Sequence, residues 1–230
     1  MPNKTRAQRK GSSRNIRTPS HRYDKKADFD DVEGEIVDIV HDPSRSAPLA
    51  KVKLEDGEER FIIAPQGLET GDKIKCGISA PIEPGNRLKL AEIPEGVPIH
   101  SIEIKPGEGG KLARSSGTYG TVKMHDIDKT VVELPSEKTK NLNPECKATV
   151  GVVAGSGRKE KPFVKAGSKH KAMKARGKKY PTVSAVSMNP VDHPFGGSTK
   201  PGKPKTTKST APPGQKAGSF GAKSSGKRED

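Results

Sequence analysis

One string of the sequence, Leu112–Tyr119 (LARSSGTY), combines residue types that suit contact with a nucleic-acid backbone. Arg114 offers a planar fork of hydrogen-bond donors, and Ser115 and Thr118 add hydroxyl groups that suit phosphate or ribose 2′-OH oxygens. Gly117 has no side chain, so it permits a close approach of the backbone to a phosphate. The string therefore predicts an RNA contact and no chemical step.

A second string, Met188–Gly197 (MNPVDHPFGG), contains His193, and any catalytic role of this histidine must be argued from its neighbours. A general base needs a group that tunes its pKa and a nucleophile within hydrogen-bond reach. Asp192 is adjacent to His193 in sequence, which usually directs the two side chains apart, and no Ser or Cys constellation accompanies them. The prolines and glycines instead predict a rigid loop that presents Asn189 and His193 to RNA. An RNA-linked enzyme or translation factor with a catalytic His193 is the alternative.

The elements that position these strings read as short β-strands with recurring turns. Alternating or β-branched segments occur at 35–40, 49–55, 60–63, 73–78, 87–93, 97–104, 118–124, 130–134 and 148–154. Asp56–Gly57 supplies a hairpin turn between two of them. No segment between residues 27 and 160 keeps a helical apolar stripe over three turns, so the middle of the chain is predicted to be all-β.

About 125 residues of short strands exceed one five-stranded barrel and suit two. Ile93–Gly96 is the expected junction, and a single β-sandwich is the alternative. Tyr119 either stacks on a base or belongs to the core of the strand that it opens, and the core position is slightly favoured.

The composition points to a polyanionic partner. The 230 residues include 43 Lys and Arg against 28 Asp and Glu, a formal net charge of +15, and only 29% are hydrophobic. Residues 1–26 contain nine basic residues and one acidic residue, and residues 155–230 contain 18 and four, whereas residues 27–154 contain 16 and 23. The positive charge is thus confined to the two ends, which are too poor in apolar residues to fold alone and are expected to order on RNA.

Several other classes of site are not expected. A membrane-binding amphipathic helix is absent, and 169–179 is interpreted as an RNA-facing turn, although it could form a short basic helix that Gly177 and Pro181 stop. Cys76 and Cys146 lack metal-site or redox spacing, and the six histidines lack metal-ligand spacing. No cofactor, metal or secretory signal is expected, and a reduced cytoplasmic compartment fits best.

Longer strings give the chain a family resemblance. HDPSRSAPLAKV at 41–52, the segment from EPGNR to GTYG at 83–120 and NPVDHPFGG at 189–197 together resemble the universal L-two family of large-subunit ribosomal proteins. The strings CKATVGVVAG at 146–155 and GRKEKPFVKAG at 157–167 resemble its archaeal form, and the resemblance covers roughly residues 12–220.

The resemblance implies a fold and a function. The fold is an oligonucleotide-binding-fold barrel followed by an SH3-like barrel, with long basic irregular extensions at both ends. The expected parts are an N-terminal arm (1–26), the first barrel (27–96), the second barrel (97–167) and an RNA-threading C-terminal extension (168–230). The implied function is that of a structural, non-catalytic ribosomal constituent. It binds large-subunit rRNA early in assembly, supports the peptidyl transferase region and tRNA positioning, and contacts neighbouring ribosomal proteins and the small subunit.

The expected RNA contacts come from charge placement and from the two strings above. They are Arg45, Lys51, Lys111, Arg114, Ser115, Thr118, Arg158, Lys159, Lys161, Lys171, Arg176, Lys178, Lys179, Asn189, His193 and Lys200. A free-standing RNA chaperone made of paired small barrels is a further alternative, and sedimentation with or without ribosomal particles distinguishes it.

Overall fold

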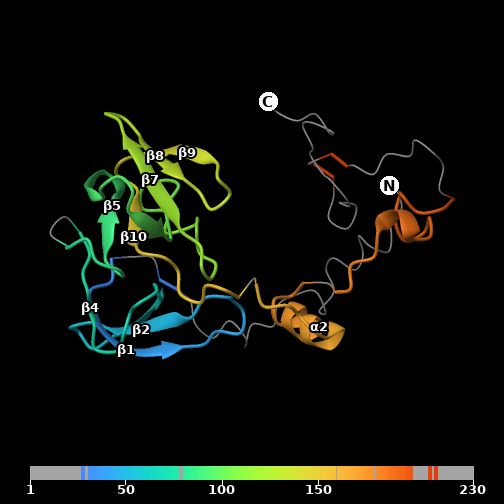
Figure 1. The fold of residues 1–230 in the computed structure, drawn as a ribbon, viewed down its shortest axis with the longest axis horizontal. Coiled ribbons are helices and arrows are strands. Elements are labelled where there is room, and N and C mark those ends of the chain that lie inside the picture. The colour runs from blue at the N-terminus through green and yellow to red at the C-terminus, as the bar shows by residue number, and fades with distance from the viewer. Residues whose placement is uncertain are drawn as a thin grey trace. The chain divides into compact units, whose positions relative to one another are not determined.

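The computed structural model of the chain describes residues 27–28, 31–77, 80–158, 160–178, 180–198, 207–208 and 210–211. The described residues up to Pro162 belong to one compact unit, and those from Phe163 onward belong to a second. The strands of both sheets lie in the first unit, and the helix α2 lies in the second (Figure 1).

The first sheet contains four antiparallel strands in the order β3-β2-β1-β4. Its strands are β1 (Gly34–Val40), β2 (Leu49–Lys53), β3 (Glu59–Ile63) and β4 (Lys73–Ile74). The expected turn between β2 and β3 is present, because Leu54 N donates to Glu58 O at 2.9 Å and Gly57 has a φ of 84°. That positive φ is easily reached by glycine.

One face of the first sheet forms an apolar core. Ile36, Val52 and Ile74 are buried together there. Opposite β2, the register of β1 shifts between Ile36 and Asp38, so Val37 is the extra residue of a β-bulge and is 48% exposed. The bulge lets β1 keep Ile36 in the core without burying its neighbour.

The second sheet contains six antiparallel strands in the order β5-β10-β6-β7-β8-β9. Its strands are β5 (Arg87–Lys89), β6 (Pro98–His100), β7 (Gly120–His125), β8 (Thr130–Glu133), β9 (Thr139–Leu142) and β10 (Lys147–Val150). Leu90, Ile99, Ile102, Val122 and Val132 are fully buried in its core. The expected all-β middle is confirmed, with a 3-10 turn at Leu90–Glu92.

Two strands differ from the sequence expectation. β5 was expected in the first barrel, but it pairs with β10, and Leu88 packs in the core of the second sheet. β9 was not expected, because its sequence TKNL has no alternating apolar residues and only Leu142 is buried. Its position is set by pairing with β8, in which Leu142 lies opposite Thr130. β5 is thus decided by a strand distant in sequence, whereas β9 is the second strand of a hairpin with β8, whose turn is closed by Leu134 N donating to Lys138 O at 3.0 Å.

The second unit contains a helix where a turn was favoured. α2 spans Ala166–Ala175, and Gly177 follows it with a φ of 63°. The interpretation of this segment as a turn is therefore wrong, although Gly177 ends the helix as expected. None of the residues of α2 is buried. The helix is thus an exposed element, and among the described residues no helix has the length and apolar character of a membrane span.

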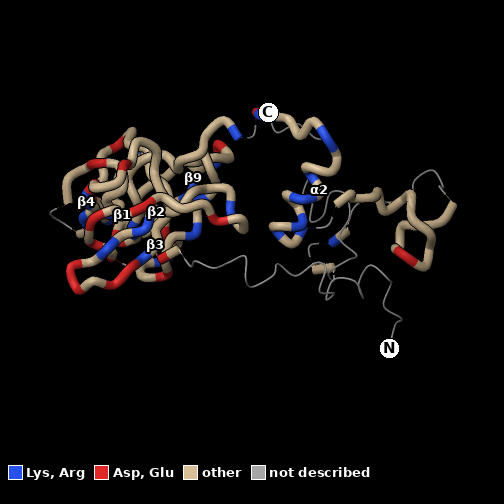
Figure 2. Tube along the Cα trace, turned by 90° about the horizontal axis from the view of Figure 1, so that it is seen from below, with Lys and Arg blue, Asp and Glu red and all other residues tan. Residues whose placement is uncertain are grey.

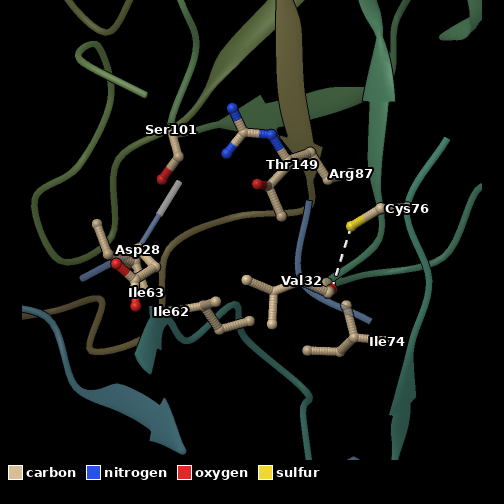
Figure 3. A pocket seen from close by; sticks show the side chains of 10 residues that line it. Asp28, Val32, Ile62, Ile63, Ile74, Cys76, Arg87, Ser101 and Thr149 are labelled. Carbon is tan, nitrogen blue, oxygen red and sulfur yellow. Dashed lines mark hydrogen bonds between the residues drawn. The ribbon is translucent and has the colours of Figure 1, made fainter. Parts of the chain in front are cut away.

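The two sheets meet around a small cavity of about 20 Å³ (Figure 3). Apolar side chains of the first sheet and its entry lie on one side, and polar side chains near the second sheet lie on the other: Val32, Ile62, Ile63 and Ile74 against Arg87, Ser101 and Thr149. Cys76 Sγ donates to Val32 O at 3.2 Å, and burial raises the pKa of the Cys76 thiol. The cavity has room for about one water molecule, so it is no substrate site.

His100 is a buried, titratable residue at the edge of the second core. Its side chain is fully buried, and its Nδ1 lies 3.0 Å from Ser101 Oγ. Burial, together with the positive charge of Arg87, lowers the pKa of His100 from 6.5 to about 3. The folded protein therefore holds this imidazole neutral at a pH at which the unfolded chain already protonates it.

We expect His100 to make the protein less stable in mild acid. Because the folded pKa is lower than the unfolded pKa, stability is full above pH 6.5 and falls as the pH drops from about 6.5 towards about 3. His100→Met removes the titration, so its free energy of unfolding should fall less steeply, by up to about 1.4 kcal/mol per pH unit. Urea unfolding of both proteins at several pH values between 7.5 and 4.5 tests this, and parallel curves would contradict it.

Candidate nucleic-acid interface

The segment that follows β10 joins the two sheets through its backbone. We call each sheet with its loops a β module. Val153 forms a β-bridge with Pro65 of the first module, and Ala154 N donates to Ala64 O at 2.9 Å. On the other side, Gly117 N donates to Val153 O at 2.9 Å. One extended segment thus pairs with both modules, and it brings loop 41–48 beside loop 112–119.

Three arginines that were expected to contact RNA lie where loop 41–48 meets loop 112–119. Ser116 N donates to Ser46 Oγ at 3.2 Å, and Arg158 Nε donates to Ser116 Oγ at 2.9 Å. Partial burial and the nearby charge of Arg45 lower the pKa of Arg114, so these two guanidinium groups are electrostatically coupled. We call Arg45, Arg114 and Arg158 the arginine seam. Its three members come from segments far apart in the sequence.

Asp42 fixes the loop that carries Arg45. Its carboxylate is buried and accepts hydrogen bonds from Ser44 N at 2.9 Å, Ser44 Oγ at 2.6 Å and Arg45 Nε at 2.6 Å. Burial alone would raise the pKa of Asp42, but the hydrogen bonds from Ser44 and Arg45 outweigh it, and the pKa is lowered. The charged carboxylate therefore holds Arg45 in place.

The second unit carries a basic helix. Figure 2 shows Lys and Arg along α2, whereas turns of the first sheet carry many Asp and Glu residues. Lys169 Nζ lies 5.4 Å from the centre of the Tyr180 ring, a cation–π contact that ties the helix to the chain after it. Lys171 is exposed on the helix, and Arg176 and Lys178 follow directly. A helix without a buried face is suited to a polar partner such as RNA.

The loop Met188–Gly197 closes on itself. Gly197 N donates to Met188 O at 3.1 Å, and Asp192 N donates to Asn189 O at 2.9 Å. A Cβ atom at Gly196 would lie 2.3 Å from Asn189 O, so the closure requires glycine at this position. The expectation of a compact, constrained loop is confirmed by these contacts.

His193 faces the inside of that loop. It is 2% exposed, its Nδ1 accepts a hydrogen bond from Phe195 N at 3.0 Å, and its ring packs edge-on against Phe195 at 5.1 Å between centroids. The expectation that the loop presents His193 at its surface is therefore wrong. The imidazole stabilises the loop, and Asn189 is the exposed member of the predicted pair.

Comparisons with known proteins cover nearly the whole chain. Residues 3–76 match the family described as "Ribosomal Proteins L2, RNA binding N-terminal domain", and residues 83–217 match "Ribosomal Proteins L2, C-terminal domain". The chain belongs to the ribosomal protein L2 family. The two domains follow in the expected order and are consistent with an oligonucleotide-binding-fold barrel and an SH3-like barrel. The gap between the two matched ranges, residues 77–82, precedes β5.

Archaeal L2 relatives are about half identical to this chain. The protein of Methanothermobacter thermautotrophicus is 53% identical over 96% of this chain and 97% of its own length. That of Natronomonas pharaonis is 54% identical over 96% and 94%, and that of Methanopyrus kandleri is 49% identical over 99% and 98%. Each of these relatives is named "Large ribosomal subunit protein uL2". The expected family, including its archaeal form, is confirmed.

Other predicted contact residues of this L2 chain lie apart from the seam or are already engaged. Lys51 pairs with Glu59 at 2.6 Å on the first sheet, and Lys111 pairs with Glu108. Thr118 Oγ1 donates to Ser115 O at 2.6 Å, so this hydroxyl shapes the loop. Lys161 is exposed near the end of the first unit. Lys159, Lys179 and Lys200 lie outside the described residues.

Tyr119 and the seam serines show where sequence reasoning was incomplete. Tyr119 is 47% exposed, so the favoured core position is wrong. Ser46 and Ser116 were not predicted, although they join the two loops. The sequence does contain a signal for the turn in loop 41–48, which carries Ser46. Asp42–Pro43–Ser44 is typical of a turn closed by an aspartate side chain. No comparable local signal marks Ser116.

Replacing Gly117 by alanine should open the seam. Gly117 has a φ of 68°, and a Cβ atom there would lie 2.8 Å from Ser156 Cα, so the substitution adds a backbone collision to conformational strain. Gly157→Ala is the matched control, since Gly157 has a φ of 76° but nothing within 4 Å. We expect Gly117→Ala to lower the melting temperature and RNA affinity more than Gly157→Ala. Equal losses in thermal unfolding and filter binding would show that positive φ alone matters.

Proposed function

We propose that this L2 chain is a structural constituent of the large ribosomal subunit and that it binds large-subunit rRNA through the arginine seam. The observation that carries the proposal is the convergence of Arg45, Arg114 and Arg158 where the two β modules are joined. Arginine suits this role because its guanidinium is planar, weakly hydrated and able to bind phosphate with two donors. The names of the relatives support the same assignment.

The basic ends extend the same interaction. We propose that an arm at 1–26 and an extension at 168–230 follow the rRNA and neutralise its phosphates, and that the remaining predicted basic residues and the exposed Asn189 contact the rRNA. The separation of charge supports this proposal, because residues 155–230 contain 18 basic and four acidic residues. Carboxylates repel phosphates, so the carboxylates of the acidic region 27–154 are expected to face solvent or neighbouring ribosomal proteins.

The proposed role is non-catalytic and cytoplasmic, within the ribosome. A catalytic histidine must contact the reacting atoms, and the burial of His193 inside its own loop argues against such contact. In keeping with the family resemblance, the protein would bind rRNA early in assembly, support the peptidyl transferase region and the positioning of tRNA, and contact the small subunit. No cofactor or metal enters this proposal.

Electrostatic attachment predicts a steep dependence on salt. If six to ten phosphates are neutralised, the affinity of the full chain for a large-subunit rRNA transcript should fall about 10³- to 10⁵-fold between roughly 50 and 200 mM salt. Replacing all three seam arginines by glutamine should reduce the slope of log affinity against log salt by about 2 to 3. Filter binding across this range measures both slopes.

The matched control is Lys53→Gln, Lys73→Gln and Lys75→Gln, which removes the same charge from a groove on the first sheet. This control should change the slope less than the seam variant does. Equal changes in slope for the two variants would mean that RNA affinity depends only on the net charge of the protein. A flat salt dependence of the unmodified protein would contradict the proposal as a whole.

Sedimentation separates the structural role from that of a free RNA chaperone. A ribosomal constituent should travel with the large-subunit peak in a sucrose gradient at physiological salt, because many phosphate contacts act together. Particle-bound protein that remains after pelleting and washing supports the proposal. Recovery of the chain only near the top of the gradient would favour a chaperone.

A further inference from the structure

A buried carboxylate organises the loop that precedes the arginine seam. The side chain of Glu103 is 3% exposed and pairs with Arg87, which is 6% exposed, at 2.8 Å. The same carboxylate accepts hydrogen bonds from three backbone amides: those of Gly109 at 3.2 Å, Gly107 at 3.3 Å and Lys147 at 2.9 Å. Glu103 therefore has four donors from three separate segments.

The loop held in this way is residues 104–111. Its base is closed by the bridge between Ile102 and Leu112, in which Lys111 N and Leu112 N both donate to Ile102 O. Within the loop, Glu108 N donates to Lys105 O at 3.2 Å. It contains no strand or helix, so the inward contacts with Glu103 are the main constraint on its path.

The glycines of the loop make this arrangement possible. Gly107 and Gly109 have φ values of 74° and 80°, which non-glycine residues rarely adopt, and their amides turn towards one carboxylate. Backbone amides that converge in this way form a concave site for an anion. Here a side chain of the same protein fills that site, and Arg87 balances its charge.

The loop displays cations beside the seam string. Lys105 and Lys111 are exposed, and both act with Lys140 to lower the pKa of Glu108, after the direct hydrogen bond from Lys111. Directly beyond the loop, Ser101 N donates to Ala113 O at 3.2 Å, one residue before Arg114. The conformation of the loop thus controls where its lysines lie and how the chain enters the seam.

We propose that Glu103 is a positioning residue for RNA binding, acting through residues 104–111 to hold Lys105 and Lys111 where phosphates can reach them. This inference rests on the proposed rRNA-binding function. It assigns a binding role to an acidic residue that itself never touches RNA. Glu103 would repel phosphate if it were exposed, so its contribution depends on its burial and on its pairing with Arg87.

The direction in which Glu103→Gln changes RNA affinity distinguishes a positioning role of Glu103 from an effect of net charge. Glu103→Gln makes the protein more positive by one unit, so a charge effect alone would strengthen RNA binding. Positioning predicts the opposite. Filter binding of the full chain to a large-subunit rRNA transcript should show weaker binding, and the loss of affinity on raising salt from roughly 50 to 200 mM should become about three- to tenfold smaller than for the unmodified protein. Glu133→Gln is the matched control, because Glu133 pairs with Lys123 at 2.8 Å on the exposed face of the second sheet.

A second background tests whether Glu103 acts through the loop lysines. In Lys105→Gln/Lys111→Gln protein, the salt slope should already be reduced, and adding Glu103→Gln should reduce it no further. A residue that merely stabilises the fold would lower the fraction of active protein and leave the slope unchanged. A slope for Glu103→Gln equal to that of the unmodified protein overturns the inference.

Two measurements keep the test decisive if Glu103→Gln does not fold. The variant Arg87→Met/Glu103→Gln leaves no charge in this part of the core and carries the same slope test. Hydrogen exchange on the unmodified protein should show protected amides at Gly107 and Gly109, and exchange as fast as in an open loop would overturn the inference. A flat salt dependence of the unmodified protein, in contrast, would reject the proposed rRNA binding itself.

Discussion

Backbone hydrogen bonds of residues 152–154 with both β modules are the constraint on which the proposed interface depends. Each module has its own apolar core, and a third buried cluster packs Ala47 of loop 41–48 against Val153 of the joining segment. The bridge from Val153 to Pro65 and the bond from Gly117 to Val153 add the backbone connection that places loop 41–48 beside loop 112–119. Because side chains at an interface must be held to within a fraction of an ångström, a backbone connection is a better support than flexible side-chain contacts.

Buried carboxylates provide the next level of order. Asp42 and Glu103 each lie under a loop and accept several hydrogen bonds, and each has an arginine partner. A buried ion pair adds little net stability, because desolvation cancels most of the attraction, but removal of one partner is costly. The value of these pairs therefore lies in fixing one loop conformation. A defined conformation also fixes where the basic residues of each loop lie, namely Arg45 in one and Lys105 and Lys111 in the other.

The sequence was most informative where structure is local. The hairpin at Asp56–Gly57, the alternation of β2 and the closed loop 188–197 follow from turn residues and periodicity, and they are present. The sheet membership of β5 depends on β10, a partner far away in sequence that no local pattern encodes, and β9 was missed because its sequence lacks alternating apolar residues although its partner β8 directly precedes it. The site shows the same division. Arginines were found by residue type and context, whereas the burial of His193 and the exposure of Tyr119 depend on packing that a linear string does not reveal.

The acidic middle and the RNA-binding role are compatible because the charges of the β modules are largely matched in place. Lys51 pairs with Glu59, Lys89 with Glu145 and Lys147 with Asp31, each across neighbouring segments of the described modules. Exposed pairs of this kind contribute about 0–1 kcal/mol each, so their main effect is on charge and not on stability. A lysine beside a carboxylate attracts phosphate more weakly than an unpaired lysine does. In the proposed function, attraction is concentrated at the arginine seam, on α2 and at the basic ends, and this bias would favour one orientation of the compact modules on a uniformly charged polyanion.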